Sequence, residues 1–153
     1  MDEAINDAYE ELKRADHLVY VSLKYTRTAD VIKNILNRLI LAIGKAIDAL
    51  INKLIEDGKL EKRELSYPEK VKIIKSEFSE DKKIMEMLDF NAFLRKIDRA
   101  EFKGENEFRR HVKMTVVVDD AIYEIDLDKI TSFYKKTKDY VNYCRKLFIE
   151  SGA

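Results

Sequence analysis

The most informative segment of the sequence covers residues 28–56, TADVIKNILNRLILAIGKAIDALINKLIE. Its apolar residues recur at spacings of three and four, which places them on one wide face of a helix. Thr28 is a good N-cap, and Asp30 falls in the first turn, where a negative charge suits the helix dipole. The sequence therefore predicts a helix from Thr28 to about Glu56 as the spine of the core. Gly58 is expected to end it in the left-handed conformation.

A helix is expected before this spine and a charged connector after it. Residues 4–24 carry one apolar stripe at helical spacing, with His17 on the opposite side. Residues 59–65 are mostly charged and predict a connector. Gly44 lies inside the spine, where glycine costs about 1 kcal/mol relative to alanine, so we expect a close helix crossing there.

Two further helices are expected after the connector. Ser66 and Glu69 have the spacing of a capping box and predict a short helix. The run Ser79-Glu80-Asp81 predicts the start of the next helix, which we expect to reach about Phe102. Gly104 should end that helix or begin a linker.

The pattern changes to alternation at residues 112–125, where β-branched residues flank Asp119-Asp120. This predicts a β-hairpin with a two-residue turn. The expected pairs on its apolar face are Met114 with Ile125, Val116 with Tyr123, and Val118 with Ala121. A two-stranded hairpin is marginal alone, so that face should pack on the helices or on a partner chain. Asp126 can cap a final helix over residues 127–149.

Together these elements predict a mainly α fold: an up-and-down bundle of four to five helices with a β-hairpin, about 112–125, before the last helix. With 153 residues, a single domain over 1–153 is expected. One cysteine, no export signal and a charged apolar stretch predict a cytoplasmic protein without membrane contact. Abundant Lys and Glu with no Gln would suit a thermophile.

Composition excludes several chemistries. Lys plus Arg number 29 and Asp plus Glu number 29, so net charge gives no general argument for an anionic partner. Neither histidine has a glutamate three residues before it, which excludes a ferritin-like di-iron centre. One cysteine and two histidines cannot fill a structural zinc site, and four scattered glycines form no phosphate loop. We expect no metal and no cofactor, and interpret Cys144 as a small core residue.

The first candidate site is the polar cluster formed by Arg109, Arg110, His111 and Lys113. Guanidinium groups beside an imidazole can bind phosphate and move a proton at neutral pH. The alternative is that these residues are solvated and flank a strand, with Glu105 and Glu107 as ion-pair partners.

The second candidate is the basic face of the last helix, which includes Lys135, Lys136 and Lys138. Tyrosines are interleaved at 134, 140 and 143, as on an RNA-binding face. The solvent side of an amphipathic helix would have the same composition.

The Thr28-capped helix, the Ser66–Lys70 helix start and the Arg-Arg-His before an aromatic, basic last helix resemble HEPN domains, which are small and α-helical. The resemblance implies a homodimer, contact with RNA or a nucleotide, and pairing with a nucleotidyltransferase. Active members carry an Arg and a His with four to six residues between them. Arg109 and Arg110 lie too close to His111 to match, so no catalytic residue is carried over.

The leading hypothesis is a non-catalytic, homodimeric HEPN-like protein that binds a partner protein, a nucleic acid or a nucleotide. The alternative is a metal-independent ribonuclease using Arg109, Arg110 and His111, with the histidine as acid or base. A third hypothesis is an orphan structural module.

Overall fold

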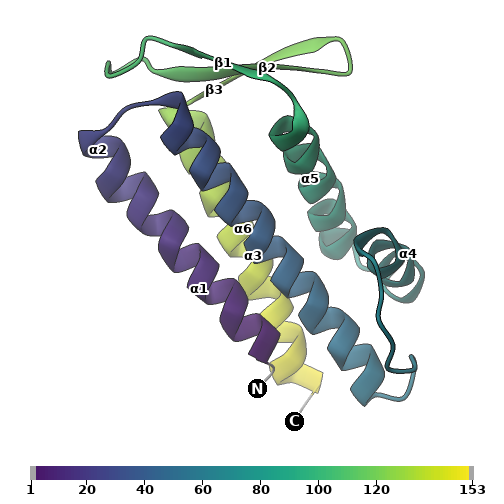
Figure 1. The fold of residues 1–153 in the computed structure, drawn as a ribbon. Coiled ribbons are helices and arrows are strands. Elements are labelled where there is room, and N and C mark those ends of the chain that lie inside the picture. The colour runs from purple at the N-terminus through teal and green to yellow at the C-terminus, as the bar shows by residue number, and fades with distance from the viewer. Residues whose placement is uncertain (1–2, 152–153) are drawn as a thin grey trace.

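The structure, a computed structural model, describes residues 3–151, with side chains to residue 149. Residues 1, 2, 152 and 153 of the expected domain lie outside the described residues. The described chain is mainly helical, with a small antiparallel sheet before the last helix (Figure 1). The predicted fold class is therefore confirmed in its helical content and in the position of its strands.

The helical elements are α1 (Glu3–His17), the π-helical turn η1 (Leu18–Ser22), α2 (Leu23–Tyr25), α3 (Ala29–Glu56), α4 (Tyr67–Glu77), α5 (Lys82–Arg99) and α6 (Leu127–Ser151). The strands are β1 (Phe102–Glu105), β2 (Lys113–Val118) and β3 (Ala121–Asp126). The helix expected over residues 4–24 is present as α1, η1 and α2, and the connector 59–65 has neither helix nor strand.

Helix α3 is the central element, with α1 and α6 packed against it (Figure 1). The Thr28 hydroxyl accepts a hydrogen bond from the Val31 N–H at 3.3 Å, which confirms the predicted cap. At the other end Gly58 has φ +75°, and the Lys59 N–H donates to the Leu54 carbonyl at 2.9 Å. These bonds satisfy terminal backbone groups, and glycine adopts the positive φ without steric cost.

Helices α4 and α5 begin as predicted. The Ser66 hydroxyl accepts from the Glu69 N–H, and the Glu69 carboxylate accepts from the Ser66 N–H, which completes a capping box. The latter bond also lowers the pKa of Glu69. The Asp81 carboxylate caps α5 by accepting from the Ile84 N–H at 3.0 Å. Short polar side chains thus fix both helix starts.

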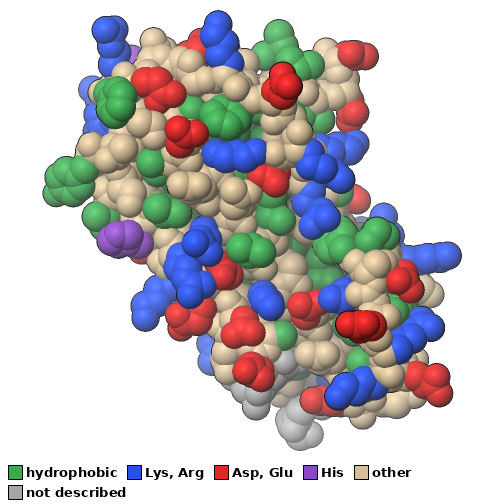
Figure 2. Space-filling model, in the orientation of Figure 1, with side chains coloured by type: hydrophobic (Ala, Val, Ile, Leu, Met, Phe, Trp, Pro, Cys, Tyr) green, Lys and Arg blue, Asp and Glu red, His purple; other side chains and the backbone are tan. Residues whose placement is uncertain are grey.

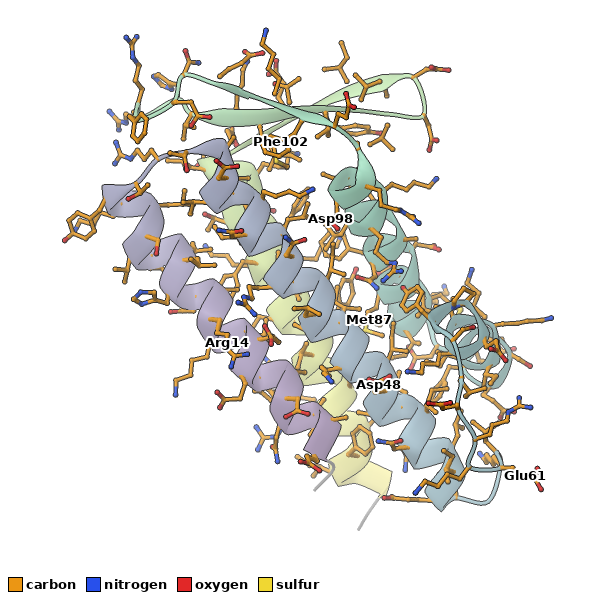
Figure 3. All side chains as sticks on the ribbon, viewed as in Figure 1. Arg14, Asp48, Glu61, Met87, Asp98 and Phe102 are labelled. Atoms are coloured by element: carbon orange, nitrogen blue, oxygen red, sulfur yellow. The ribbon has the colours of Figure 1, made fainter. Side chains whose placement is uncertain are left out.

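The expected continuation of α5 to Phe102 is wrong. The helix ends at Arg99, Ala100 is extended with ψ 149°, and Phe102–Glu105 forms β1 instead. Strand β1 pairs antiparallel with β2, which makes the sheet three-stranded, in the order β1-β2-β3. Figure 3 places Phe102 between the sheet and the helices. The Lys33 ammonium lies 5.7 Å from the centre of its ring.

The predicted hairpin register is confirmed. Met114 pairs with Ile125, Val116 with Tyr123, and Val118 with Ala121. Asp119 and Asp120 have φ of 51° and 65°, as a two-residue type I′ turn requires. Met114, Val116, Val118 and Ile125 are buried in the core of the same chain, although Tyr123 remains 37% exposed. The apolar face thus packs on the chain's own helices.

Cys144 is fully buried, which confirms its interpretation as a core residue. Burial raises the pKa of its thiol to about 12, so the thiol stays protonated at neutral pH. Within residues 3–151, none of the helices has the length and apolar character needed to cross a bilayer.

The close helix crossing expected at Gly44 is wrong, because a Cβ added there would meet no atom within 4 Å. We therefore expect Gly44→Ala to raise the free energy of unfolding by about 0.5–1 kcal/mol, since alanine restricts the unfolded chain and favours helix. Urea denaturation followed by circular dichroism measures the change. The matched control is Gly58→Ala, which should lower stability because Gly58 has φ +75°. A destabilised Gly44→Ala variant would contradict this prediction.

Candidate nucleic-acid interface

The loop between β1 and β2 is fixed onto the start of α3. The Glu107 carboxylate accepts a hydrogen bond from the Ala29 N–H at 3.0 Å, and the Phe108 N–H donates to the Arg27 carbonyl at 2.6 Å. Gly104 makes this approach possible, because a Cβ there would lie 2.0 Å from the Glu107 carboxylate oxygen. In Figure 1 the left end of the sheet lies beside the connection between α2 and α3.

These bonds bring residues from two distant segments to one place. We name the group Tyr25, Arg27, Phe108, Arg109 and Arg110 the Phe108 corner. The aromatic side chains of Tyr25 and Phe108 are 77% and 75% exposed. Phe108 has φ +62°, a conformation that a bulky residue rarely adopts. An exposed aromatic ring held on a strained backbone is a feature found at functional sites.

The arginines of the Phe108 corner make no direct ion pair in the described part of the chain, although Arg110 also lines a cleft that contains carboxylates. Among the ion pairs within residues 3–151, none includes Arg27, Arg109 or Arg110. The nearby carboxylates of Glu107 and Asp30 both lie at the N-terminus of α3, where the positive end of the helix dipole offsets their charge. Figure 2 shows blue and green side chains at the upper left, with red ones beside them. This corner therefore offers guanidinium donors of the kind that bind phosphate.

Lys113 differs from its predicted partners in the cluster. Its ammonium lies 2.9 Å from the Glu124 carboxylate and 3.5 Å from that of Glu105. The hydrogen bond to Glu124 raises the pKa of Lys113. Glu107, expected as an ion-pair partner, caps α3 instead.

Arg110 and His111 also line a cleft of about 430 Å³ between the loop and the start of α6. The cleft is shared with Lys113 and with the carboxylates of Glu124, Asp126 and Asp128. Three carboxylates make the cleft a poor anion site. The side of the loop that carries Phe108 is therefore the better place for phosphate.

The second candidate, on α6, presents cations without stacking surfaces. Lys135, Lys136 and Lys138 are exposed, as predicted. The Tyr134 hydroxyl donates to the Asp16 carboxylate at 2.8 Å, and burial raises the pKa of this tyrosine. Tyr140 is only 3% exposed. The tyrosines that suggested an RNA-binding face therefore belong largely to the core.

Within residues 3–151, no ion pair joins Lys135, Lys136 or Lys138 to a residue of the Phe108 corner. The Lys136 ammonium lies 4.9 Å from the centre of the Phe90 ring. Among the described residues, no three His, Cys, Asp or Glu side chains gather in a way that could hold a metal ion. Phosphate binding and base stacking are the chemistry that the Phe108 corner can supply.

Comparisons with protein-family models, with curated proteins and with solved structures find no match. The resemblance to HEPN domains, with the dimer and the partner that it implies, therefore stays a prediction.

Sequence reasoning missed Tyr25, Arg27 and Phe108. The available signal was an aromatic residue inside the polar run 105–113. The sequence did not reveal that Phe108 is exposed, nor that residue 27 lies beside it, because both depend on the docking of the loop.

Proposed function

We propose that this protein is a non-catalytic binding protein for single-stranded nucleic acid, with RNA as the ligand, and that the Phe108 corner holds it. The observation that carries the proposal is the exposed Phe108 ring on a loop that is docked on Arg27 and continues into Arg109 and Arg110. Tyr25, two residues before Arg27, is also exposed, and within residues 3–151 the three arginines form no ion pair. Aromatic rings stack on unpaired bases, and arginines bind the phosphates between them.

Duplexes fit this surface less well. The bases of a duplex are stacked on each other, and their faces are not available to Phe108 and Tyr25. Single strands expose these faces, and stacking is worth about 1–3 kcal/mol per base. The preference for single strands is the property that separates this proposal from a general attraction of cations for phosphate.

The proposal is tested by titrating the full chain with labelled oligouridine. A length of about 20 nucleotides is longer than the Phe108 corner, so the corner can be fully occupied. Three phosphate contacts predict a slope of about −2 for log affinity against log salt, so binding should weaken about 20-fold between about 50 and 200 mM NaCl. The duplex of the same length should bind more weakly. No saturable binding at the lower salt concentration, or equal affinity for the duplex, would contradict the proposal.

The ribonuclease alternative is tested in the same samples. The Phe108 corner adjoins His111, whose backbone carbonyl accepts from the Asn106 amide at 3.3 Å. If the enzyme hypothesis holds, RNA incubated with the protein in EDTA is cleaved, and His111→Ala stops the cleavage. Intact RNA that remains bound supports the binding function instead.

We keep the HEPN-like bundle, the homodimer and a nucleotidyltransferase partner as parts of the proposal. The apolar hairpin face was expected to pack on the helices or on a partner chain, and Val116 and its neighbours are buried in the core of the same chain. This face therefore gives the dimer no support. Light scattering over a range of concentrations tests the dimer separately. A monomer throughout would remove the dimer and leave the nucleic-acid proposal intact.

A further inference from the structure

A groove of about 490 Å³ runs between α4 and α5, away from the Phe108 corner. Its floor is apolar and is formed by Tyr67, Pro68, Val71, Leu88 and Ala92. Figure 2 shows green side chains over these helices, at the right of the view, with blue ones around them. The floor is shallow, since Pro68 and Ala92 are exposed.

The rims of the groove are basic on both sides. Lys72 and Lys75 come from α4, and Arg95, Lys96 and Arg99 come from α5. Asp89 is the single carboxylate among the lining residues. In a chain with 29 basic and 29 acidic residues, this is a strong local imbalance. The rim therefore complements a negatively charged ligand.

The groove is pre-formed by polar contacts beneath and across it. The Asn91 amide donates to the Tyr67 hydroxyl at 2.6 Å, which ties the start of α4 to α5. The Arg95 guanidinium stacks on the Tyr67 ring, 3.9 Å from its centre. Lys96 is held by Asp119 at 2.9 Å. Within residues 3–151, no ion pair includes Lys72, Lys75 or Arg99.

We propose that this groove docks an amphipathic helix of a partner protein, with an apolar face flanked by Asp and Glu. The lining on α5 extends from Leu88 to Arg99, about 16 Å at 1.5 Å per residue. That length matches about three turns of a bound helix. An apolar floor with basic rims on both sides suits a bound helix that lies along the groove. The apolar side chains of that helix, at spacings of three and four residues, would contact the floor. A small molecule would need a deeper site that buries most of its surface.

The test uses the full chain and a designed peptide with leucines on one helical face and glutamates on both flanks. Its binding is measured by fluorescence anisotropy against a peptide with lysines in place of the glutamates. We expect the protein to bind the glutamate peptide saturably and the lysine peptide not at all. Lys72→Glu combined with Lys75→Glu should weaken the affinity for the glutamate peptide at least about tenfold, because two side chains that attract the peptide's carboxylates would then repel them.

The matched control combines Lys13→Glu with Lys59→Glu, two exposed lysines outside the groove, and should leave the affinity unchanged. Ala92→Trp fills the exposed floor and should abolish binding while the circular dichroism spectrum stays that of the folded chain.

Three results would overturn the proposal. They are an absence of saturable binding to the folded protein, equal binding of both peptides, and equal losses in the groove and control variants. Oligouridine binding that is lost in the groove variant would instead assign the groove to nucleic acid.

Discussion

Val116→Asp is expected to lower the free energy of unfolding by about 3–5 kcal/mol, because it buries a carboxylate without a partner. Val116 is 1% exposed and lies on the inner face of the sheet, where it pairs with both Phe102 and Tyr123. Small domains have free energies of unfolding of about 5–15 kcal/mol, so this substitution would remove a large part of the stability. Urea denaturation followed by circular dichroism measures it.

The neighbouring residue is the matched control. Val117 is 58% exposed on the outer face, and Val117→Asp should change the stability by no more than about 0.5–1 kcal/mol. If Val116→Asp does not fold, Val116→Ala gives the comparison, with an expected loss of about 1–3 kcal/mol. Equal losses of stability at positions 116 and 117 would show that either the strand register or the assignment of the buried face of the sheet is wrong.

The second large effect concerns binding. Arg109→Glu combined with Arg110→Glu should weaken oligouridine binding about 10- to 100-fold, because two phosphate contacts become repulsions. The salt dependence should also become shallower, since fewer counterions are released on binding. Anisotropy titrations at two salt concentrations measure both changes.

The other basic candidate provides the control. Lys135→Glu combined with Lys138→Glu makes the same change in net charge on the exposed face of α6. We expect less than about a threefold change, because exposed cations without stacking surfaces add only a general attraction. A larger loss from the α6 variant than from the loop variant would move the binding surface to α6.

The helices and strands that the sequence predicts correctly are marked by residues only a few positions apart in the chain. Thr28, Ser66 and Asp81 cap helices through bonds to residues three positions ahead, so each cap is visible in a few letters of sequence. The hairpin register follows from alternation around Asp119-Asp120, because a two-residue turn leaves one pairing.

The missed elements depend on contacts between distant segments. Strand β1 has four residues, includes Gly104 and shows no helical or alternating pattern, so only its partner β2 defines it. Glu107 caps a helix that begins 78 residues earlier in the chain. The same docking brings Phe108 to Arg27. Of the candidate site, only Arg109 and Arg110 could therefore be predicted from the sequence.

Stacking of Phe108 on single-stranded nucleic acid is tested by comparing the oligouridine affinity of Phe108→Gly with that of the wild-type protein. Glycine adopts φ +62° without strain, and the ring it removes is 75% exposed, so the stability should stay within about 1 kcal/mol of wild type. Phe108→Tyr keeps an aromatic ring and should bind like wild type.

We expect Phe108→Gly to bind oligouridine at least about fivefold more weakly than wild type, which corresponds to the loss of one stacked base. Equal affinity of the glycine, tyrosine and wild-type proteins would contradict it.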